Sequence, residues 1–164
     1  MTDQVAIRHD LRPGDLGTVI HLHGVHYARE WGLDTTFEPY VAAPLADFIL
    51  KGPDAGRLWL AEINDVVVGS IALVKTDSGE GQLRWFLLTP EGRGRGLGQQ
   101  LIAHTLDYAR DHGLSHIFLW TFDGLAAAQH LYRKAGFRET QRETQSLWGQ
   151  NLVEIRMDLD LSPT

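Results

Sequence analysis

The sequence contains no cysteine, which excludes disulfides, thiolate metal sites and a cysteine nucleophile. It also lacks any apolar run of the length that a membrane-spanning helix requires, so we expect no membrane partner. The N-terminal segment MTDQVAIRHD carries acidic residues and no long apolar stretch, so we expect no signal peptide. These absences together predict a cytoplasmic protein that supplies no cysteine thiol of its own to any reaction.

Positive charge is also scarce. The chain has 15 lysine and arginine residues against 21 aspartate and glutamate residues, a formal net charge of −6. Nucleic-acid binding needs a positive field over the phosphates, so we expect no nucleic-acid partner, whereas a cationic acceptor such as an amine is compatible. The length of 164 residues and the hydrophobic share of 43% predict a single domain over residues 1–164.

The most informative stretch runs from Gln82 to Leu106. The apolar segment QLRWFLL ends at Thr89, a loop rich in glycine and arginine follows, and an amphipathic helical pattern begins directly after the loop. A helix N-terminus offers unpaired N–H groups and a positive dipole end, and glycine lets an anion approach the backbone. The segment therefore predicts a pyrophosphate-binding loop, against the alternative of a turn with two solvated arginines. Its residues are Arg93, Gly94, Arg95, Gly96, Leu97, Gly98 and Gln99.

Spacing excludes two other phosphate-binding loops. A P-loop ends in Gly-Lys-Ser or Gly-Lys-Thr, and neither tripeptide occurs in this chain. A dinucleotide fingerprint has the form Gly-x-Gly-x-x-Gly, but its third glycine would fall on Gln99 if it began at Gly94, and on Leu101 if it began at Gly96. The pattern that is present is Arg-x-x-Gly-x-Gly.

The remaining chain alternates short strands with helices. Periodicity and turn residues predict strands at 5–7, 57–63, 66–74, 82–88, 117–120, 137–147 and 152–161, and helices at 16–31, 36–51, 98–112 and 125–135. We expect Asp15 to cap the first helix, and Pro44 to kink the second or divide it in two. The first three long strands should form an antiparallel meander, and the helix after the loop should lead to a parallel strand.

Two motifs resemble those of one enzyme family. The Arg-x-x-Gly-x-Gly pattern is similar to the acyl-CoA pyrophosphate loop of the GCN5-related N-acetyltransferases (GNAT), and the segment LYRKAGF at 131–137 is similar to their LYxKxGF segment. The order of elements resembles that family over nearly the whole chain. Within the family, the stretch HLHGVHYAREWGLDTTFEPYVA and the segment LWTFD look most like the acetyltransferase halves of MarR-type regulator fusions.

The resemblance implies an α/β (α+β) fold. Its central sheet would be mixed, mostly antiparallel and about seven-stranded, with about four flanking helices and a splay between strands four and five. It also implies direct transfer of an acetyl group from the co-substrate acetyl-CoA to a primary amine of a small molecule or peptide. Family members are often dimers, so a homodimer is one alternative, and nothing in this sequence decides the oligomeric state.

Site residues follow from the same resemblance. Phe86, Leu87 and Leu88 would lie along the pantetheine arm, with a backbone N–H near Leu88 polarising the thioester carbonyl, although their side chains also suit a core. Tyr132 matches the tyrosine that protonates the departing thiolate. A phenol, with a reference pKa of about 10, is protonated at neutral pH and suits a general acid. The alternative for Tyr132 is an ordinary core tyrosine.

The general base is where the sequence departs from the family. Many members carry a glutamate early in strand four, and the matching residue here is Gln82, which cannot accept a proton. The asparagine often found seven residues before the tyrosine is Leu125 in this chain. Candidate substitutes, in the helices that would frame the acceptor, are His26, Glu30 and Glu38.

Two further hypotheses stay open. The missing glutamate favours a non-catalytic acyl-CoA-binding or sensor module that works with a regulator, whereas Tyr132 favours an enzyme. His21, His23 and His26 could suggest a metal site, but the chain has neither a His-Glu-x-x-His pattern nor a cysteine to complete one, so we expect no metal.

Overall fold

The computed structural model describes residues 1–162. Within that range the strands are β1 (Val5–Arg8), β2 (Gly56–Ile63), β3 (Val66–Lys75), β4 (Gly81–Leu88), β5 (His116–Phe122), β6 (Arg138–Leu147) and β7 (Gln150–Asp160). The helices are α1 (Asp15–Trp31), α2 (Phe37–Leu50), α3 (Leu97–Asp111) and α4 (Ala126–Ala135), with short 3-10 helices η1 (Pro53–Ala55) and η2 (Pro90–Gly92). Among the described residues, no helix is both long and apolar enough to cross a membrane.

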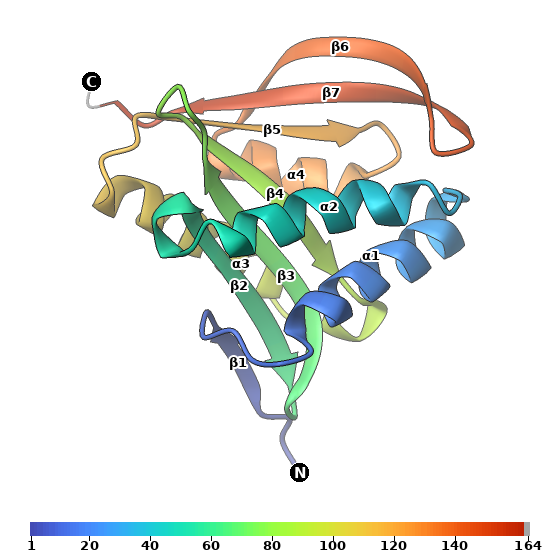
Figure 1. Ribbon diagram of the computed structural model, residues 1–164, viewed down its shortest axis with the longest axis vertical. Coiled ribbons are helices and arrows are strands. Elements are labelled where there is room, and N and C mark those ends of the chain that lie inside the picture. Colours follow the sequence, from blue (N-terminus) through green and yellow to red (C-terminus); the bar gives the residue numbers. More distant parts are fainter. Residues whose placement is uncertain (163–164) are drawn as a thin grey trace.

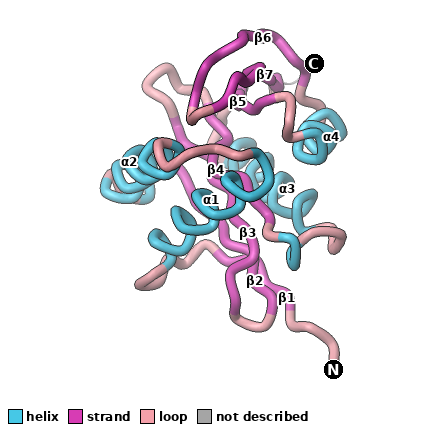
Figure 2. The backbone as a smooth tube through the Cα atoms, turned by 90° about the vertical axis from the view of Figure 1, so that its right-hand side faces the viewer, coloured by secondary structure: helices cyan, strands magenta, loops and turns pink. Residues whose placement is uncertain are grey.

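The strands form one sheet in the order β1-β2-β3-β4-β5-β7-β6 (Figure 1). Helices α1 and α2 cover one face of this sheet, and α3 and α4 cover the other (Figure 2). The core is accordingly divided in two. One cluster packs Val19, Val41 and Leu45 of the first helix pair on the sheet, and the other packs Leu101 and Tyr132 of the second pair. The predicted fold class is confirmed.

Strands β4 and β5 are parallel but paired only at their beginnings. Their register consists of Gly81 opposite Ile117 and Gln82 opposite Phe118, after which the two strands diverge (Figure 1). All other neighbouring strands in the sheet are antiparallel and paired over longer stretches. The splay predicted between the fourth and fifth strands is therefore present, and it leaves the edge of β4 from residue 83 onward without a strand partner.

A β-bulge interrupts β4 in its middle. Leu87 pairs with Ser70 and Arg84 with Ala72, so a single residue of β3 faces the two residues Trp85 and Phe86 of β4. Trp85 has a φ of 49°, uncommon for a bulky residue, and its carbonyl accepts a 2.7 Å hydrogen bond from the Ser70 hydroxyl. The extra residue changes which face of the sheet the following side chains occupy.

The bulge places two consecutive side chains toward α1 and α2. Arg84 shares the face of its partner Ala72, which belongs to the core cluster beneath α1 and α2. Trp85 belongs to the same cluster, whereas Phe86 packs against the cluster beneath α3 and α4. In regular alternation Arg84 and Trp85 would lie on opposite faces. The bulge therefore places the Trp85 ring beside the Arg84 cation on the face that α1 and α2 cover.

The start of α1 differs from the prediction. The N-cap is Gly14, with a φ of 93°, and Asp15 is the first residue of the helix, so the predicted Asp15 cap is wrong by one position. The Asp15 carboxylate instead accepts the backbone N–H of Arg12 at 2.7 Å and pairs with Arg8 at 2.8 Å. Arg8 also pairs with Glu62 of β2 at 2.7 Å. Asp15 thus ties α1 to the sheet edge rather than capping the helix.

The second helix passes through its proline. Helix α2 is a single helix from Phe37 to Leu50, with Pro44 inside it, so it is not divided in two. Proline removes one N–H donor and disfavours a helix interior, but the apolar face of α2 is deeply buried at Val41, Leu45 and Phe48. Tertiary packing therefore outweighs the local penalty.

Candidate active site

A cavity of about 920 Å³ occupies the wedge between β4 and β5. Its walls come from α1, α2, β4, the loop before α3, the end of β5 and α4, so both core faces contribute. Most of the site residues predicted from the sequence border it: Glu30, Phe86, Leu87, Leu88, Arg93, Gly94, Gly96, Leu97, Gly98, Gln99 and Tyr132. Arg95, His26 and Glu38 are not among the residues that line it.

The glycine-rich loop (residues 93–99) has the geometry of an anion site. Gly94 and Gly96 have φ values of 73° and 75°, in the left-handed region that favours glycine. A Cβ atom on Gly94 would meet nothing within 4 Å, and one on Gly96 would meet only the Gln100 side chain at 3.9 Å. Gly96 is also the N-cap of α3 and provides no side-chain cap for its first-turn N–H groups. Open space and free donors therefore meet at one helix N-terminus.

The next glycine serves packing. Gly98 lies in the first turn of α3, and a Cβ there would come within 2.7 Å of the Leu131 side chain on α4. A side chain at this position would have to displace the Leu131 methyl group, so glycine favours the close approach of α3 and α4. This contact holds α4, and with it Tyr132, beside the glycine-rich loop.

The two loop arginines are engaged with other protein groups. The Arg93 guanidinium forms a two-pronged pair with the Glu30 carboxylate of α1, at 2.8 Å for Nη2–Oε2, and its Nε donates to the Leu88 carbonyl at 3.1 Å. The pair with Arg93 holds the pKa of Glu30 below its usual value. Arg95 pairs with Asp3 at 2.8 Å and donates to the Glu91 carbonyl. Arg93 therefore joins the loop, β4 and α1, while Arg95 is directed away from the cavity.

The end of β4 presents a free N–H group to the wedge. Thr89 donates its N–H to the Val68 carbonyl of β3 at 2.8 Å. Because successive residues of a strand direct their backbone groups to opposite edges, the N–H and carbonyl of Leu88 face the open edge toward β5. The carbonyl is held by Arg93, which leaves the N–H available to a carbonyl oxygen in the cavity.

Tyr132 borders the cavity from α4. Its side chain is 5% exposed and packs between the rings of Phe86 and Phe137, whose centroids lie 5.8 and 5.9 Å away. Burial, together with the nearby Tyr27 phenol on α1, raises the pKa of Tyr132 well above its ordinary value. The phenol is therefore protonated throughout the neutral range and can only donate a proton there.

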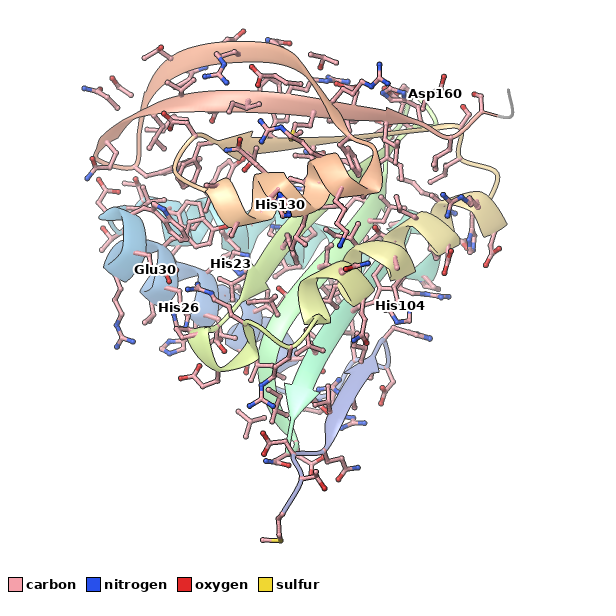
Figure 3. All side chains as sticks on the ribbon, turned by 180° about the vertical axis from the view of Figure 1, so that it is seen from behind. His23, His26, Glu30, His104, His130 and Asp160 are labelled. Carbon is pink, nitrogen blue, oxygen red and sulfur yellow. The ribbon has the colours of Figure 1, made fainter. Side chains whose placement is uncertain are left out.

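The three predicted base candidates on α1 and α2 are placed differently. Figure 3 labels His26 and Glu30 along α1, and of the three only Glu30 borders the cavity. Its carboxylate is already held by Arg93. The carboxyl group of Glu38 lies against Gly24, 3.2 Å from where a Cβ would be.

Several residues that sequence analysis did not place in the site also border the cavity. Tyr27 is half-buried, and desolvation followed by the Glu30 charge raises its pKa. His23 is buried, its Nδ1–H donates to the Val19 carbonyl at 2.8 Å, and burial lowers its pKa to about 4. That bond leaves Nε2 as an acceptor, and it has no hydrogen-bond partner within residues 1–162. The described residues contain no group of three or more His, Asp or Glu positioned to hold a metal ion.

Glu154 supplies a second carboxylate to the cavity. It lies on β7, opposite Phe122 of β5 and Glu143 of β6, and borders the same space. Burial, and then the negative charge of Glu143, raises the pKa of Glu154. A single glutamate in the segment LVEIRMDLD gives no local signal of a site, because its face depends on the register of three strands.

The comparisons with known proteins agree with this architecture. The model of the Acetyltransferase (GNAT) family matches residues 25–137, more than half of the chain. The chain therefore belongs to the GNAT acetyltransferase family, which confirms the resemblance seen in its two motifs.

Curated relatives share part of the chain. Human N-acetyltransferase 8B is 32% identical over 102 residues, covering 59% of this chain and 44% of that protein. An uncharacterised N-acetyltransferase of Schizosaccharomyces pombe is 33% identical over 119 residues, covering 70% of this chain and 72% of that protein. The chain spans about half the length of the mammalian relatives that it matches.

Solved structures share the fold over nearly the full length. An N-acetyltransferase from Staphylococcus aureus Mu50 has a TM-score of 0.80 at 17% identity, covering 97% of this chain and 99% of that chain. Spermidine N-acetyltransferase from Vibrio cholerae, solved with CoA and spermine, has a TM-score of 0.73 at 21% identity, with 96% of each chain covered. At 17% and 21% identity, these two matches show that the chains share a fold and show nothing more.

Proposed function

We propose that this protein is an acetyl-CoA-dependent N-acetyltransferase, built as one domain over residues 1–164, that acetylates a primary amine of a small molecule or peptide. The observation that carries the proposal is one cavity that combines an anion-binding loop, a free strand edge and a buried phenol. Membership of the GNAT family supports acetyl-CoA as the co-substrate. Location in the cytoplasm remains part of the proposal.

The pyrophosphate of acetyl-CoA would occupy the glycine-rich loop, where the open space at Gly94 and Gly96 fits an anion. The pantetheine arm would follow the unpaired edge of β4 along Phe86, Leu87 and Leu88. The Leu88 N–H would stabilise charge on the thioester oxygen. The contacts that Arg93 makes with Glu30 and Leu88 support a positioning role for its side chain, since they use three of the five guanidinium N–H donors.

The reaction requires one proton to leave the amine and one to reach sulfur. The C–N bond forms as the C–S bond breaks, and the Tyr132 hydroxyl donates its proton to the departing thiolate. Of the bases expected from the sequence, His26, Glu30 and Glu38, Glu30 is the one bordering the cavity. Glu154 is a stronger candidate than Glu30, because it has no ion-pair partner within residues 1–162 and its raised pKa makes its carboxylate more basic.

The first test is calorimetric titration of acetyl-CoA and of desulfo-CoA into the protein. We expect both ligands to bind, acetyl-CoA with a dissociation constant in the micromolar range, because the loop and the β4 edge contact parts that both share. An amine panel, followed by thiol release, then tests transfer. Failure of both ligands to bind would remove the loop assignment and the proposed function together.

A non-catalytic sensor is the second candidate, and Gln82 favours it. Gln82 borders the cavity at the position where many relatives carry a glutamate, and it cannot accept a proton. A sensor would bind acetyl-CoA with the same affinity but release no thiol with any amine. A narrower proposal accompanies this candidate: the chain is related to the acetyltransferase halves of MarR-type fusion regulators. This proposal rests on the stretch from His21 to Ala42 and on the LWTFD segment.

The Glu154 assignment predicts a specific pH dependence. A general base is active when deprotonated, so kcat/KM should rise as pH increases through the raised pKa of Glu154. Glu154→Gln should lower kcat about tenfold and flatten this rise, since water and Glu30 still accept protons.

Glu143→Gln is the matched variant. Removing the neighbouring negative charge lowers the pKa of Glu154, so the rise should move to lower pH with the plateau unchanged. An unaltered profile in Glu154→Gln would assign the base elsewhere.

A further inference from the structure

Arg84 is a half-buried arginine without an acidic partner. Within residues 1–162, Arg57 is also half-buried and without a carboxylate partner, but its guanidinium lies 4.9 Å from the Tyr108 ring centre and it does not border the cavity. Arg8, Arg93 and Arg156 each pair with a carboxylate of the chain. Arg84 borders the cavity, and no carboxylate oxygen within residues 1–162 lies within 4.0 Å of its guanidinium nitrogens. Buried charges are normally paired, because a charge removed from water is destabilised unless another group compensates it. The Arg84 guanidinium therefore has no anionic partner in the chain, and a bound ligand can supply one.

The surroundings of Arg84 leave its donors free for such a partner. The guanidinium carbon lies 4.6 Å from the centre of the Trp85 ring, which supports one flat side of the group. Burial lowers the pKa of Arg84, and only the phenol of Tyr40 opposes this effect. A guanidinium carries five N–H donors in a planar fork, so one phenol cannot satisfy it.

The missing anion cannot be the pyrophosphate, because Arg84 faces the other side of the sheet. Arg84 pairs with Ala72 of the cluster beneath α1 and α2 and so faces those helices, whereas the glycine-rich loop leads into α3. The cavity next to Arg84 is the half that an acceptor would enter.

Besides the Arg93–Glu30 pair, that half combines aromatic walls with two charged groups that have no ion-pair partner within residues 1–162, Arg84 and Glu154. Its rings come from α1, α2, β5 and the hairpin between β6 and β7: Tyr27, Trp31, Phe37, Tyr40, Phe122 and Trp148. Phe37 links them, with centroids 4.7 Å from Tyr27 and 5.0 Å from Trp148. Glu154 lies on the same face, opposite Phe122. The lining therefore matches a ligand that has an apolar body and carries both an ammonium group and an anionic group.

We propose that the acceptor is a small amine with an apolar body and a carboxylate, as in a free aromatic or aliphatic amino acid, and that Arg84 binds the carboxylate. This inference rests on the proposed function and names its substrate class. The planar fork of Arg84 suits a carboxylate, which it can hold by two parallel hydrogen bonds. Arg84 then decides which amines are used, while the transfer chemistry stays with the groups already described.

The test compares each amino acid with its own amide, which keeps the amine and the side chain but has no negative charge. We expect kcat/KM for the best of L-phenylalanine, L-tryptophan, L-leucine and L-methionine to exceed that of its amide at least about tenfold, as for one charge-assisted pair. Arg84→Met should bring the ratio near one, and Arg84→Lys, which keeps the charge but not the fork, should give an intermediate ratio.

A matched control separates recognition from folding. Arg138→Met removes an exposed arginine on β6 that does not border the cavity, and it should leave the ratio unchanged. If Arg84 only stacks on Trp85, Arg84→Met should lower the melting temperature and reduce both rates equally, which overturns the proposal. Product binding gives a readout that needs no turnover: with CoA present, N-acetyl-L-phenylalanine should bind at least about tenfold more tightly than N-acetyl-2-phenylethylamine.

The outcomes distinguish this inference from the proposed function. If acetyl-CoA binds but no carboxylate-bearing acceptor or product has an advantage, the inference is wrong and the acetyltransferase proposal stands. If acetyl-CoA does not bind, both are wrong. A carboxylate preference that disappears in Arg84→Met and persists in Arg138→Met supports the inference.

Discussion

Gly96→Trp is expected to abolish acetyl-CoA binding while the protein remains folded. Gly96 caps α3 with a φ of 75°, and the space over it is open, since a Cβ there would meet only the Gln100 side chain, at 3.9 Å. An indole there would fill the volume that the pyrophosphate needs and would shield the first-turn N–H groups. We expect calorimetry to show affinity weaker by at least about a hundredfold, since several charge-assisted hydrogen bonds would be lost.

The matched control is Gly113→Trp, at the other end of the same helix. Gly113 has a φ of 69°, and a Cβ there would also have open space, with nothing within 4 Å, so the substitution imposes similar backbone strain without touching the cavity. Strain of this kind costs about 1–2 kcal/mol in either variant. Equal loss of affinity in both would indicate a general folding defect. Unchanged affinity in Gly96→Trp would show that the loop does not bind the co-substrate.

The fold could be predicted because its signals are local. Each strand and helix has its own periodicity, and the glycine-rich loop lies between a strand and a helix that are contiguous in sequence. The predictions for Asp15 and Pro44 differ from the structure where tertiary contacts outweigh a local signal. Asp15 fits an N-cap by type, but its carboxylate is recruited by Arg8, which arrives from β1 through tertiary contact. Pro44 fits a kink or a break, and of these the break is wrong, because burial of α2 keeps the helix continuous through the proline.

The site was less accessible, because its charged groups depend on register and on distant partners. Arg93 looked like a phosphate ligand, yet it pairs with Glu30, 63 residues earlier in the chain. Arg84 looked like one polar residue in an alternating strand, and only its pairing with Ala72 shows that it faces α1 and α2, with Trp85 brought to the same face by the bulge. Glu154 reaches the cavity only through the pairing of β7 with β5 and β6. A shift of one residue in any of these strands would move the side chain to the other face.

Tyr132→Phe is expected to lower kcat about a hundredfold and to leave acetyl-CoA affinity within about twofold of the original value. The substitution removes one oxygen from a side chain that is otherwise packed between Phe86 and Phe137. Positioning of the two substrates is retained, so turnover should fall without vanishing. The matched control is Tyr108→Phe, which removes the same atom from another buried tyrosine of the α3–α4 side that does not border the cavity.

The dependence of kcat on pH and on the leaving thiol distinguishes a proton donor at Tyr132 from a tyrosine with a purely structural role. A general acid is active while protonated, so the rate should fall only when pH rises through its pKa. Burial raises the pKa of Tyr132 well above its ordinary value, so the original protein should show no alkaline loss of kcat from this group up to about pH 9. In Tyr132→Phe the thiolate must take its proton from water, so the deficit should shrink for acyl donors with a more acidic leaving thiol. A deficit that stays constant across such donors, or a kcat equal to that of Tyr108→Phe, would exclude Tyr132 as the proton donor.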